Sequence, residues 1–424
     1  MCLLRNATTF ILVLLLLLPG CVSPTSSIEE NDTETVSLVV WHSFATESKE
    51  LATFESQIVR FMASNPGVEV ETSAIPFSEA ARQFMIAAQG GEAPDVVRLS
   101  SDQLGEIGEV RVGGQSLLED LRPHLTPFER SKFDARALNA MKYDGDLLGI
   151  PASQDCLSLI FNPLLFDAAG IDHPSEDWTL NDMVSAASQL TQGDVHGLAM
   201  PVKNAYWWFG FQAGYGGSLF DENGTPTLDS NGSAEAMDWM VDLEVTHGVV
   251  QTGTQSESMK TQFLSSKAAM VVDGPWNWAT YEAGRIPLQQ SILPIVDSTG
   301  ERVSPLVTYK GWSVSKQSSQ KEWSVRLALH LSSSDSQREF ALDTYTMPTH
   351  VDVYVDSEVA QNPVISGFLE QLMVGFPAPT TEAMSMVYDP LGTAFENVYS
   401  GELDATSALV AADAALESDL EGSG

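Results

Sequence analysis

Apolar residues follow two different spacings along the first part of the chain. Short apolar or β-branched runs at 36–41, 68–70 and 95–99 predict three buried strands. Between them, apolar residues recur every three or four positions over 51–62 and 80–88, which predicts two helices. The order strand, helix, strand, helix, strand is typical of a parallel sheet with helices on both faces.

The alternation continues and predicts a second unit. Apolar runs at 147–150 and 157–161 flank residues 151–156, which we interpret as a first crossing between domains. Helical and short apolar segments at 237–243 and 268–272 predict a second α/β domain. Helical spacing resumes at 323–331, 337–342, 388–399 and 405–416.

The chain length also favours two domains. Its 424 residues exceed the size at which one hydrophobic core stops growing. We expect an α/β fold of two lobes, each a mostly parallel sheet flanked by helices, with hinge strands between them. The N-terminal lobe is expected to comprise 36–153 plus 313–376, and the C-terminal lobe 154–312 plus 377–424.

The N-terminus has the features of an export signal. Arg5 precedes an apolar run at 10–18, which is too short to span a bilayer and is followed closely by Cys21. We interpret 1–20 as a lipoprotein signal peptide and Cys21 as the acylated residue; an ordinary signal peptide is the alternative. Residues 21–35 are rich in Ser, Thr, Asp and Glu and predict a flexible tether.

Composition excludes several kinds of site. Fifty-seven acidic and 21 basic side chains give a formal charge of −36, which disfavours nucleic acid and anionic membranes as partners. Cys156 is the only thiol outside the N-terminal segment, so neither an internal disulfide nor a cysteine metal site is expected. No Gly-x-Ser-x-Gly elbow, paired histidine spacing or Gly-rich phosphate loop occurs. We therefore expect no catalytic residue, metal or cofactor, although the many acids do not exclude the carboxylate pair of a glycosidase.

Aromatic side chains are concentrated at two places. Residues 206–215 hold six aromatics in ten positions, Tyr206 and Trp207 among them, against 8% for the whole chain. The second place is the stretch VVDGPWNW, in which Trp276 and Trp278 follow a predicted strand and a Gly-Pro step. Residues two apart on a helix do not share a face, so one indole is expected at a binding surface and the other in the core.

Several stretches together resemble the extracellular solute-binding proteins of ABC importers, in the maltose, maltodextrin and trehalose branch. They are VVWHSF, GEAPDVVRLSSDQLG, GIPASQDCLSLIFNPLLFDAAGI, GGSLFDENGTPTL, SSKAAMVVDGPWNWA, YTMPTH and VYSGELDATSAL, and they extend over most of the chain. The resemblance implies the type II periplasmic-binding-protein fold, in which two lobes close on a sugar. It also implies a monomer at the extracellular face of the membrane or in the periplasm, with permease subunits as partners and the lipid on Cys21 as the only membrane contact.

The resemblance also implies roles for individual residues. It puts Asp102 and Asp155 on sugar hydroxyls, and His42 and Ser43 at a polar contact in the first loop. It puts aromatic rings against the sugar and two residues at the wall of the site. These are Tyr206, Trp276 and Tyr388 for the rings, and Gly311 and Trp312 for the wall. The sequence departs from this branch near Leu99, Gln103 and Ala378, which leaves the exact sugar open.

These observations favour a non-enzymatic receptor that captures an α-linked di- or oligosaccharide and delivers it to a permease. A binding protein for another solute, such as glycerol phosphate or a polyamine, is the first alternative. Phosphate would require Arg or Lys at the site, and Arg98 and Lys203 are the nearest to the candidate loops. A surface glycosidase using Asp102 or Asp155 is the second alternative.

Overall fold

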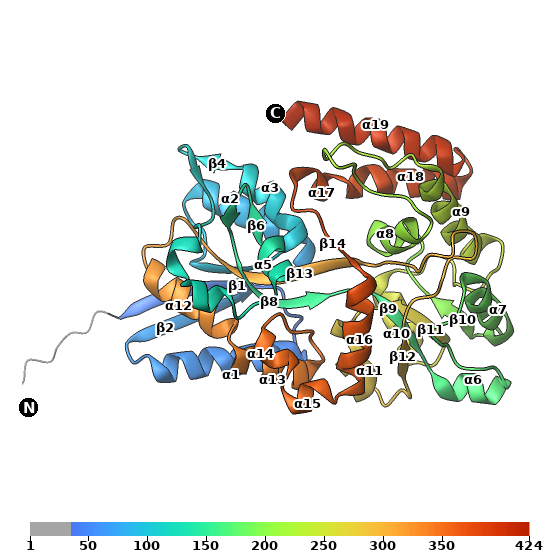
Figure 1. Cartoon of the computed structure of the whole chain (residues 1–424), viewed down its shortest axis with the longest axis horizontal. Helices are drawn as coiled ribbons and strands as arrows, with labels where there is room; N and C mark the ends of the chain where they lie inside the picture. The colour runs from blue at the N-terminus through green and yellow to red at the C-terminus, as the bar shows by residue number, and fades with distance from the viewer. Residues whose placement is uncertain (1–34, 424) are drawn as a thin grey trace, which may run out of the picture. The chain divides into compact units, whose positions relative to one another are not determined.

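The strands of the first sheet come from the whole length of the chain (Figure 1). The computed structural model describes residues 35–423, so the predicted signal peptide, the acylation of Cys21 and nearly all of the tether lie outside the described part. The sheet has the order β14-β13-β3-β1-β2, and β8 also pairs with β13. Its members are β1 (Val36–His42), β2 (Val68–Ala74), β3 (Val96–Ser100), β8 (Ile150–Asp155), β13 (Leu306–Val314) and β14 (Phe376–Pro377).

The predicted strand-helix alternation is confirmed at the start of this sheet. Strand β1 pairs in parallel with both β2 and β3, whereas β13 runs antiparallel to β3 and β8. Helix α1 (Lys49–Ser64) begins at Ser48, whose side chain accepts a hydrogen bond from the backbone N–H of Leu51, and buries Phe54 with its apolar face. The other helices of this part are α2 (Ala80–Gly90), α3 (Leu104–Glu109), α4 (Pro127–Arg130), α5 (Ala135–Ala140), α12 (Lys321–Leu331), α13 (Ser334–Thr344), α14 (Val351–Tyr354) and α15 (Ser357–Ala360). Helix α16 (Pro363–Val374) packs both on α15 and on strand β12 (Gln289–Ser291) of the second sheet.

The second sheet has the order β10-β11-β9-β12. It consists of β9 (Ser158–Phe161), β10 (His196–Ala199), β11 (Ala268–Asp273) and β12 (Gln289–Ser291), and its helices are α6 (Pro163–Ala169), α7 (Leu180–Leu190), α8 (Ala205–Gly214), α9 (Asn231–Val245), α10 (Ser256–Leu264) and α11 (Trp278–Ala283). Only β10 and β11 are parallel, because β9 pairs antiparallel with β11 and β12. This differs from the mostly parallel sheet expected. Alternating helices and strands do not fix the direction of β9, which enters from the first sheet.

Three chain segments connect the two sheets. The first is residues 156–157, through which strand β8 leads to β9. The second precedes Leu306, because β13 already pairs within the first sheet at that residue. It therefore does not lie at 312–313, where the expected lobe boundary placed it. After β14, helix α17 (Glu382–Met386) packs on α3. A Cβ at Gly105 would lie 2.2 Å from the carbonyl carbon of Thr381, so the glycine permits this close approach. The last helices, α18 (Tyr388–Ser400) and α19 (Ala405–Ser423), pack on each other and on α9.

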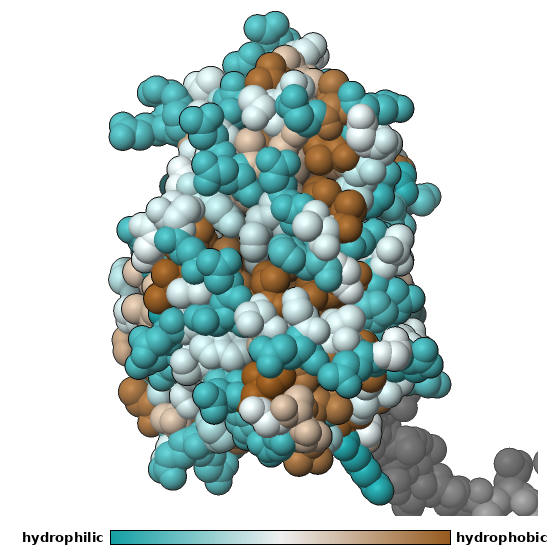
Figure 2. Space-filling view, turned by 90° about the vertical axis from the view of Figure 1, so that its right-hand side faces the viewer, coloured by the Kyte–Doolittle hydropathy of each residue, from teal (hydrophilic) through white to brown (hydrophobic). Residues whose placement is uncertain are grey.

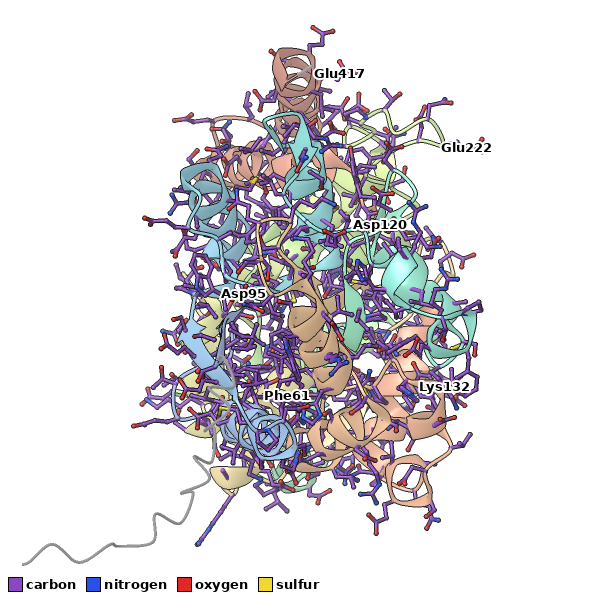
Figure 3. All side chains as sticks on the ribbon, turned by 90° about the vertical axis from the view of Figure 1, so that its left-hand side faces the viewer. Phe61, Asp95, Asp120, Lys132, Glu222 and Glu417 are labelled. Atoms are coloured by element: carbon purple, nitrogen blue, oxygen red, sulfur yellow. The ribbon has the colours of Figure 1, made fainter. Side chains whose placement is uncertain are left out.

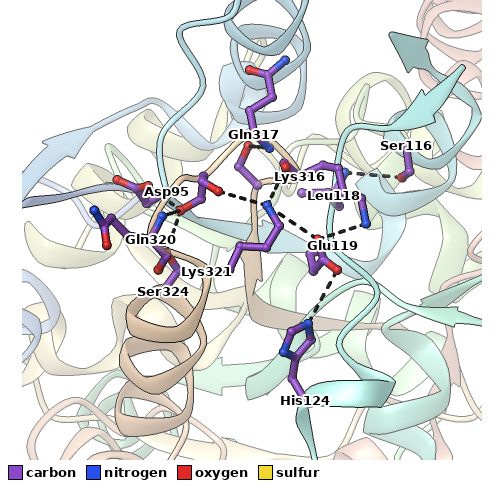
Figure 4. Close-up of polar contacts among 12 residues, drawn as sticks. Asp95, Ser116, Leu118, Glu119, His124, Lys316, Gln317, Gln320, Lys321 and Ser324 are labelled. Carbon is purple, nitrogen blue, oxygen red and sulfur yellow. Dashed lines mark hydrogen bonds and ion pairs between the residues drawn. The ribbon is translucent and has the colours of Figure 1, made fainter. Parts of the chain in front are cut away.

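Polar contacts tie the first sheet together at the end away from the carboxyl ends of its parallel strands (Figure 4). The carboxylate of Glu119 pairs with the ammonium groups of Lys316 at 3.0 Å and Lys321 at 3.7 Å. Beside them, Asp95 accepts hydrogen bonds from the Ser318 hydroxyl at 2.6 Å and from the N–H of Val39 at 2.9 Å. The loop after β13 is thereby fastened to β1.

Four acidic residues from different parts of the chain mark separate regions of the molecule. Asp95, Asp120, Glu222 and Glu417 lie well apart in Figure 3. In Figure 2, hydrophilic residues cover much of one face, and apolar residues show between them. No helix within residues 35–423 has the length and apolar character needed to cross a membrane.

Candidate functional site

Carboxylates predicted to bind a ligand lie at the carboxyl ends of strands of the first sheet. Ser100 ends β3 and forms a capping box with Gln103. This capping box begins the short 3-10 helix Ser101–Gln103, which has Asp102 in its first turn. Asp102 is 8% exposed, and no described residue donates a hydrogen bond to its buried Oδ1 atom. A buried acceptor without a partner is costly in a folded protein, so this oxygen is suited to an incoming donor.

The second carboxylate, Asp155, is held by a lysine that the sequence analysis missed. The ammonium of Lys310 lies 2.5 Å from Asp155 Oδ2 and donates to the Thr308 hydroxyl at 2.7 Å. Strands β8 and β13 bring these residues together, because Thr308 pairs with Asp155 in the antiparallel ladder. The Lys310 ammonium also lies 5.8 Å from the ring centre of Phe77, which is 43% exposed and begins the short 3-10 helix Phe77–Glu79 after β2.

An arginine with an acidic neighbour lies beside this pair. The guanidinium of Arg98 donates to the hydroxyls of Ser43 at 3.1 Å and Ser153 at 3.4 Å and lies 4.4 Å from the ring centre of Phe44. Burial lowers the pKa of Arg98, while the charges of Glu50 and Asp155 act in the opposite direction. Serine hydroxyls and neighbouring carboxylates therefore surround Arg98.

Aromatic rings from the other part of the fold lie near these charges. Tyr206 lies in the first turn of α8, where the Asn204 side chain accepts a hydrogen bond from its N–H, and its ring centre is 6.4 Å from that of Trp276. Burial is the main cause that raises the pKa of Tyr206, and Asp155, Tyr388 and Asp102 add to it. Burial and then Asp102 likewise raise the pKa of Tyr388. Both hydroxyls therefore lie near the carboxylates of the first sheet.

The structure thus brings together five of the ten predicted residues, and a sixth is linked to them through Arg98. The five are Asp102, Asp155, Tyr206, Trp276 and Tyr388, and the sixth is Ser43. In the stretch that contains both indoles, Trp276 is half-buried and Trp278 is 4% exposed, in agreement with one outer and one inner ring. Contact of these residues with a ligand remains a prediction.

The other four predicted residues are held mainly by packing contacts, although the ring of Trp207 also lies against that of Tyr206, with centres 5.6 Å apart, and His42 lies near Arg98. Trp312 is 2% exposed and its indole stacks on Phe54 with ring centres 5.4 Å apart. The indole N–H of Trp207 donates to the carbonyl of Val272 at 2.6 Å inside the second sheet.

His42 and Gly311 are also occupied by packing. The Nδ1 atom of His42 accepts a hydrogen bond from the N–H of Phe44 at 3.2 Å, and burial, followed by the Arg98 charge, lowers the pKa of His42 to about 4. A Cβ at Gly311 would lie 2.8 Å from the carbonyl oxygen of Ile150, so this glycine lets β13 approach β8. A single sequence does not distinguish such core positions from neighbouring site positions, because both are apolar or adjacent to strand ends.

A cavity of about 830 Å³ lies elsewhere, between the loop 217–224 and the segment 374–381. None of the ten predicted residues lines it, and its walls include Leu219, Phe220 and Phe376. We found no group of His, Cys, Asp or Glu side chains in residues 35–423 that is arranged to hold a metal ion. Cys156 is a free, buried thiol whose pKa is raised by burial.

The chain is similar to known binding proteins over most of its length. A family model described as bacterial extracellular solute-binding protein matches residues 56–366. The maltodextrin-binding protein MdxE of Bacillus subtilis (strain 168) is 26% identical over 306 residues, and the match covers 70% of each protein. The galactooligosaccharide-binding protein of the same organism is 21% identical over 403 residues, with 92% of this chain and 91% of the relative covered.

A solved structure agrees with the predicted fold. The maltose/maltodextrin-binding domain MalE from Bdellovibrio bacteriovorus, bound to maltotriose, matches with a TM-score of 0.83 and 23% identity, covering 91% of this chain and 100% of that one. The α/β periplasmic-binding-protein fold is thereby confirmed. Because the family model matches well over half of the chain, the protein belongs to the bacterial extracellular solute-binding protein family, whose members bind a solute and are not enzymes.

Proposed function

We propose that the protein is the substrate-binding receptor of an ABC importer and binds an α-linked di- or oligosaccharide between its two sheets. The observation that carries this proposal is that Tyr206 on α8 and Tyr388 on α18 lie near the buried carboxylates Asp102 and Asp155 at strand ends of the first sheet, with Trp276 beside Tyr206. Maltodextrin- and galactooligosaccharide-binding proteins among the relatives support a sugar of this class.

The two kinds of side chain suit the two kinds of surface on a pyranose ring. Tyr206, Trp276 and Tyr388 offer apolar ring faces for the C–H surface of the sugar. Asp102 and Asp155 accept hydrogen bonds from sugar hydroxyls, and charge makes such bonds stronger than neutral ones. The acceptor Oδ1 of Asp102 has no donor among the described residues, so a hydroxyl there would satisfy it.

Delivery to the permease requires a change of shape that depends on the ligand. We infer two lobes built around the two sheets, with the expected division into 36–153 plus 313–376 and 154–312 plus 377–424 changed at one place. The second crossing is shifted to the region before Leu306, as the pairing of β13 indicates. A sugar that contacts both lobes binds the closed form better than the open form, and this difference in affinity drives closure. We further propose that a lipid on Cys21 holds the receptor at the extracellular face of the membrane or in the periplasm.

An anionic solute such as glycerol phosphate is less well supported. Arg98 and Lys310 both lie at the site, but Lys310 is paired with Asp155, and Arg98 lies beside Glu50 and Asp155. A phosphate would have to displace these carboxylates from the cations. A polyamine would compete for Asp155 with Lys310 in the same way.

Isothermal titration calorimetry tests the proposal directly. The protein is titrated with maltose, trehalose, maltotriose and longer maltodextrins, and with spermidine and glycerol 3-phosphate as other solute classes. We expect saturable binding of at least one saccharide and a loss of about tenfold or more in affinity for Asp102→Asn, because a charged acceptor is removed. Glu222→Gln, on the wall of the separate cavity, is the matched control and should leave the affinity unchanged. Binding of spermidine or glycerol 3-phosphate with no saccharide bound would refute the substrate class.

A further inference from the structure

The residue before the Gly-Pro turn is a carboxylate that the surrounding chain encloses completely. Asp273 ends β11 and is 0% exposed. Its Oδ2 atom accepts hydrogen bonds from the Tyr281 hydroxyl at 2.5 Å and the Asn277 amide at 2.9 Å. Its Oδ1 atom accepts the N–H of Gly274 at 2.8 Å. All three donors belong to the short segment 274–281, which also carries Trp276.

The indole of Trp276 is seated directly on this turn. A Cβ at Gly274 would lie 2.0 Å from Cζ3 of Trp276, so the six-membered part of the indole covers the glycine. The backbone of Gly274, with φ −99° and ψ 176°, is open to any residue. The glycine is therefore needed because the ring lies on it, and not because of its backbone conformation.

We propose that Asp273 is a positioning residue, which fixes the turn 274–277 and thereby holds the Trp276 indole in the orientation that faces Tyr206. The proposal rests on the proposed function, because it gives the turn a role in solute binding through Trp276. Asp273 itself does not touch the solute, because it is fully buried and both oxygens of its carboxylate already accept hydrogen bonds from Gly274, Asn277 and Tyr281.

An ordinary structural role is a weaker explanation of the same contacts. The short 3-10 helix Pro275–Asn277 and helix α11 each begin without a side-chain capping bond, so Asp273 does not act as their N-cap. Burial of a carboxylate is unfavourable, and it raises the pKa of Asp273 to about 6 even though three donors oppose the shift. An apolar residue would avoid this cost but would leave the three donors of the turn without their acceptor.

The test removes one donor without removing a ring. Tyr281→Phe keeps the aromatic packing on Phe263, at 4.8 Å between ring centres, and deletes the hydroxyl that binds Asp273. Tyr399→Phe is the matched control, because it deletes a hydroxyl near the carbonyl of Met240 in the same part of the fold.

Two readouts keep the proposal separate from the proposed function. In the ligand-free protein labelled with 5-fluorotryptophan, the ¹⁹F resonance of Trp276, assigned with Trp276→Phe, should shift or broaden in Tyr281→Phe and not in Tyr399→Phe. With the best saccharide of the panel, Tyr281→Phe should weaken binding by about fivefold. In a Trp276→Ala background, the same substitution should change the affinity by less than about twofold, because no indole is left to position.

An unchanged Trp276 resonance in Tyr281→Phe would overturn the inference whether or not any sugar binds. Equal losses of affinity in the two backgrounds would overturn it as well, because the hydroxyl would then act independently of the indole. If no saccharide binds the wild type, the proposed function fails, and the resonance alone decides whether Asp273 positions Trp276.

Discussion

Replacing Lys310 by methionine tests whether the ion pair at the site is an integral part of the fold. The ammonium lies 2.5 Å from Asp155, and the two side chains are only 11% and 9% exposed. Methionine has a similar length and no charge, so the change leaves a buried carboxylate without its closest cation. Removing one partner of a buried pair typically costs about 3–5 kcal/mol of stability.

Because Arg98 is also nearby, we expect a loss of stability at the lower end of that range. Its charge also acts on Asp155, so part of the compensation remains when Lys310 is replaced. We expect Lys310→Met to lower the free energy of unfolding by about 3 kcal/mol. The double variant Lys310→Met/Asp155→Asn removes the orphaned charge too, and should recover to within about 1 kcal/mol of the wild type.

Equilibrium unfolding in urea measures these differences, provided that the slope of free energy against denaturant is the same for all variants. Lys203→Met is the control, because the Lys203 ammonium lies 3.4 Å from a Glu396 carboxylate that is 70% exposed. An exposed pair of this kind should contribute about 1 kcal/mol or less. If Lys310→Met loses no more than the control, or if the double variant loses the sum of its two single changes, the reasoning about the buried pair is refuted.

Three further predictions concern the turn that carries Trp276. Trp276→Ala should lower saccharide affinity by about 1–3 kcal/mol in titration calorimetry with little change in the melting temperature; a collapse in melting temperature would instead make Trp276 a core residue. Gly274→Ala should keep the fold by circular dichroism but weaken binding, because its methyl group would displace the indole 2.0 Å away; wild-type affinity would contradict the observed seating of the ring. The raised pKa of Asp273, about 6, means that the folded protein binds more protons than the unfolded chain between about pH 4 and 6. Asp273 therefore stabilises the fold least at high pH. In urea unfolding, the free energy of unfolding of the wild type minus that of Asp273→Asn should fall by up to about 3 kcal/mol from pH 4 to 7. A difference that does not change with pH would contradict the raised pKa.

Local spacing in the sequence was sufficient to predict many of the elements. The apolar positions of 51–62 became the buried face of α1, and the run 268–272 became β11. Spacing also separated Trp276 from Trp278, because residues two apart on a helix do not share a face, and the structure has Trp276 half-buried and Trp278 buried.

Contacts between distant segments were not predictable in this way. Lys310 and Asp155 meet only because β13 pairs with β8, and nothing near either residue in the sequence indicates that pairing. The direction of β9 was missed for the same reason. Trp312 lies on a fully buried strand, where neither alternation nor composition distinguishes a residue at the site from one in the core.

A crystal structure of the protein with maltotriose tests the central claim most directly. The account predicts that the glucose rings lie against Tyr206, Trp276 and Tyr388, and that their hydroxyls bind Asp102 and Asp155. A sugar bound in the separate cavity beside the loop 217–224, with these five side chains untouched, would contradict it.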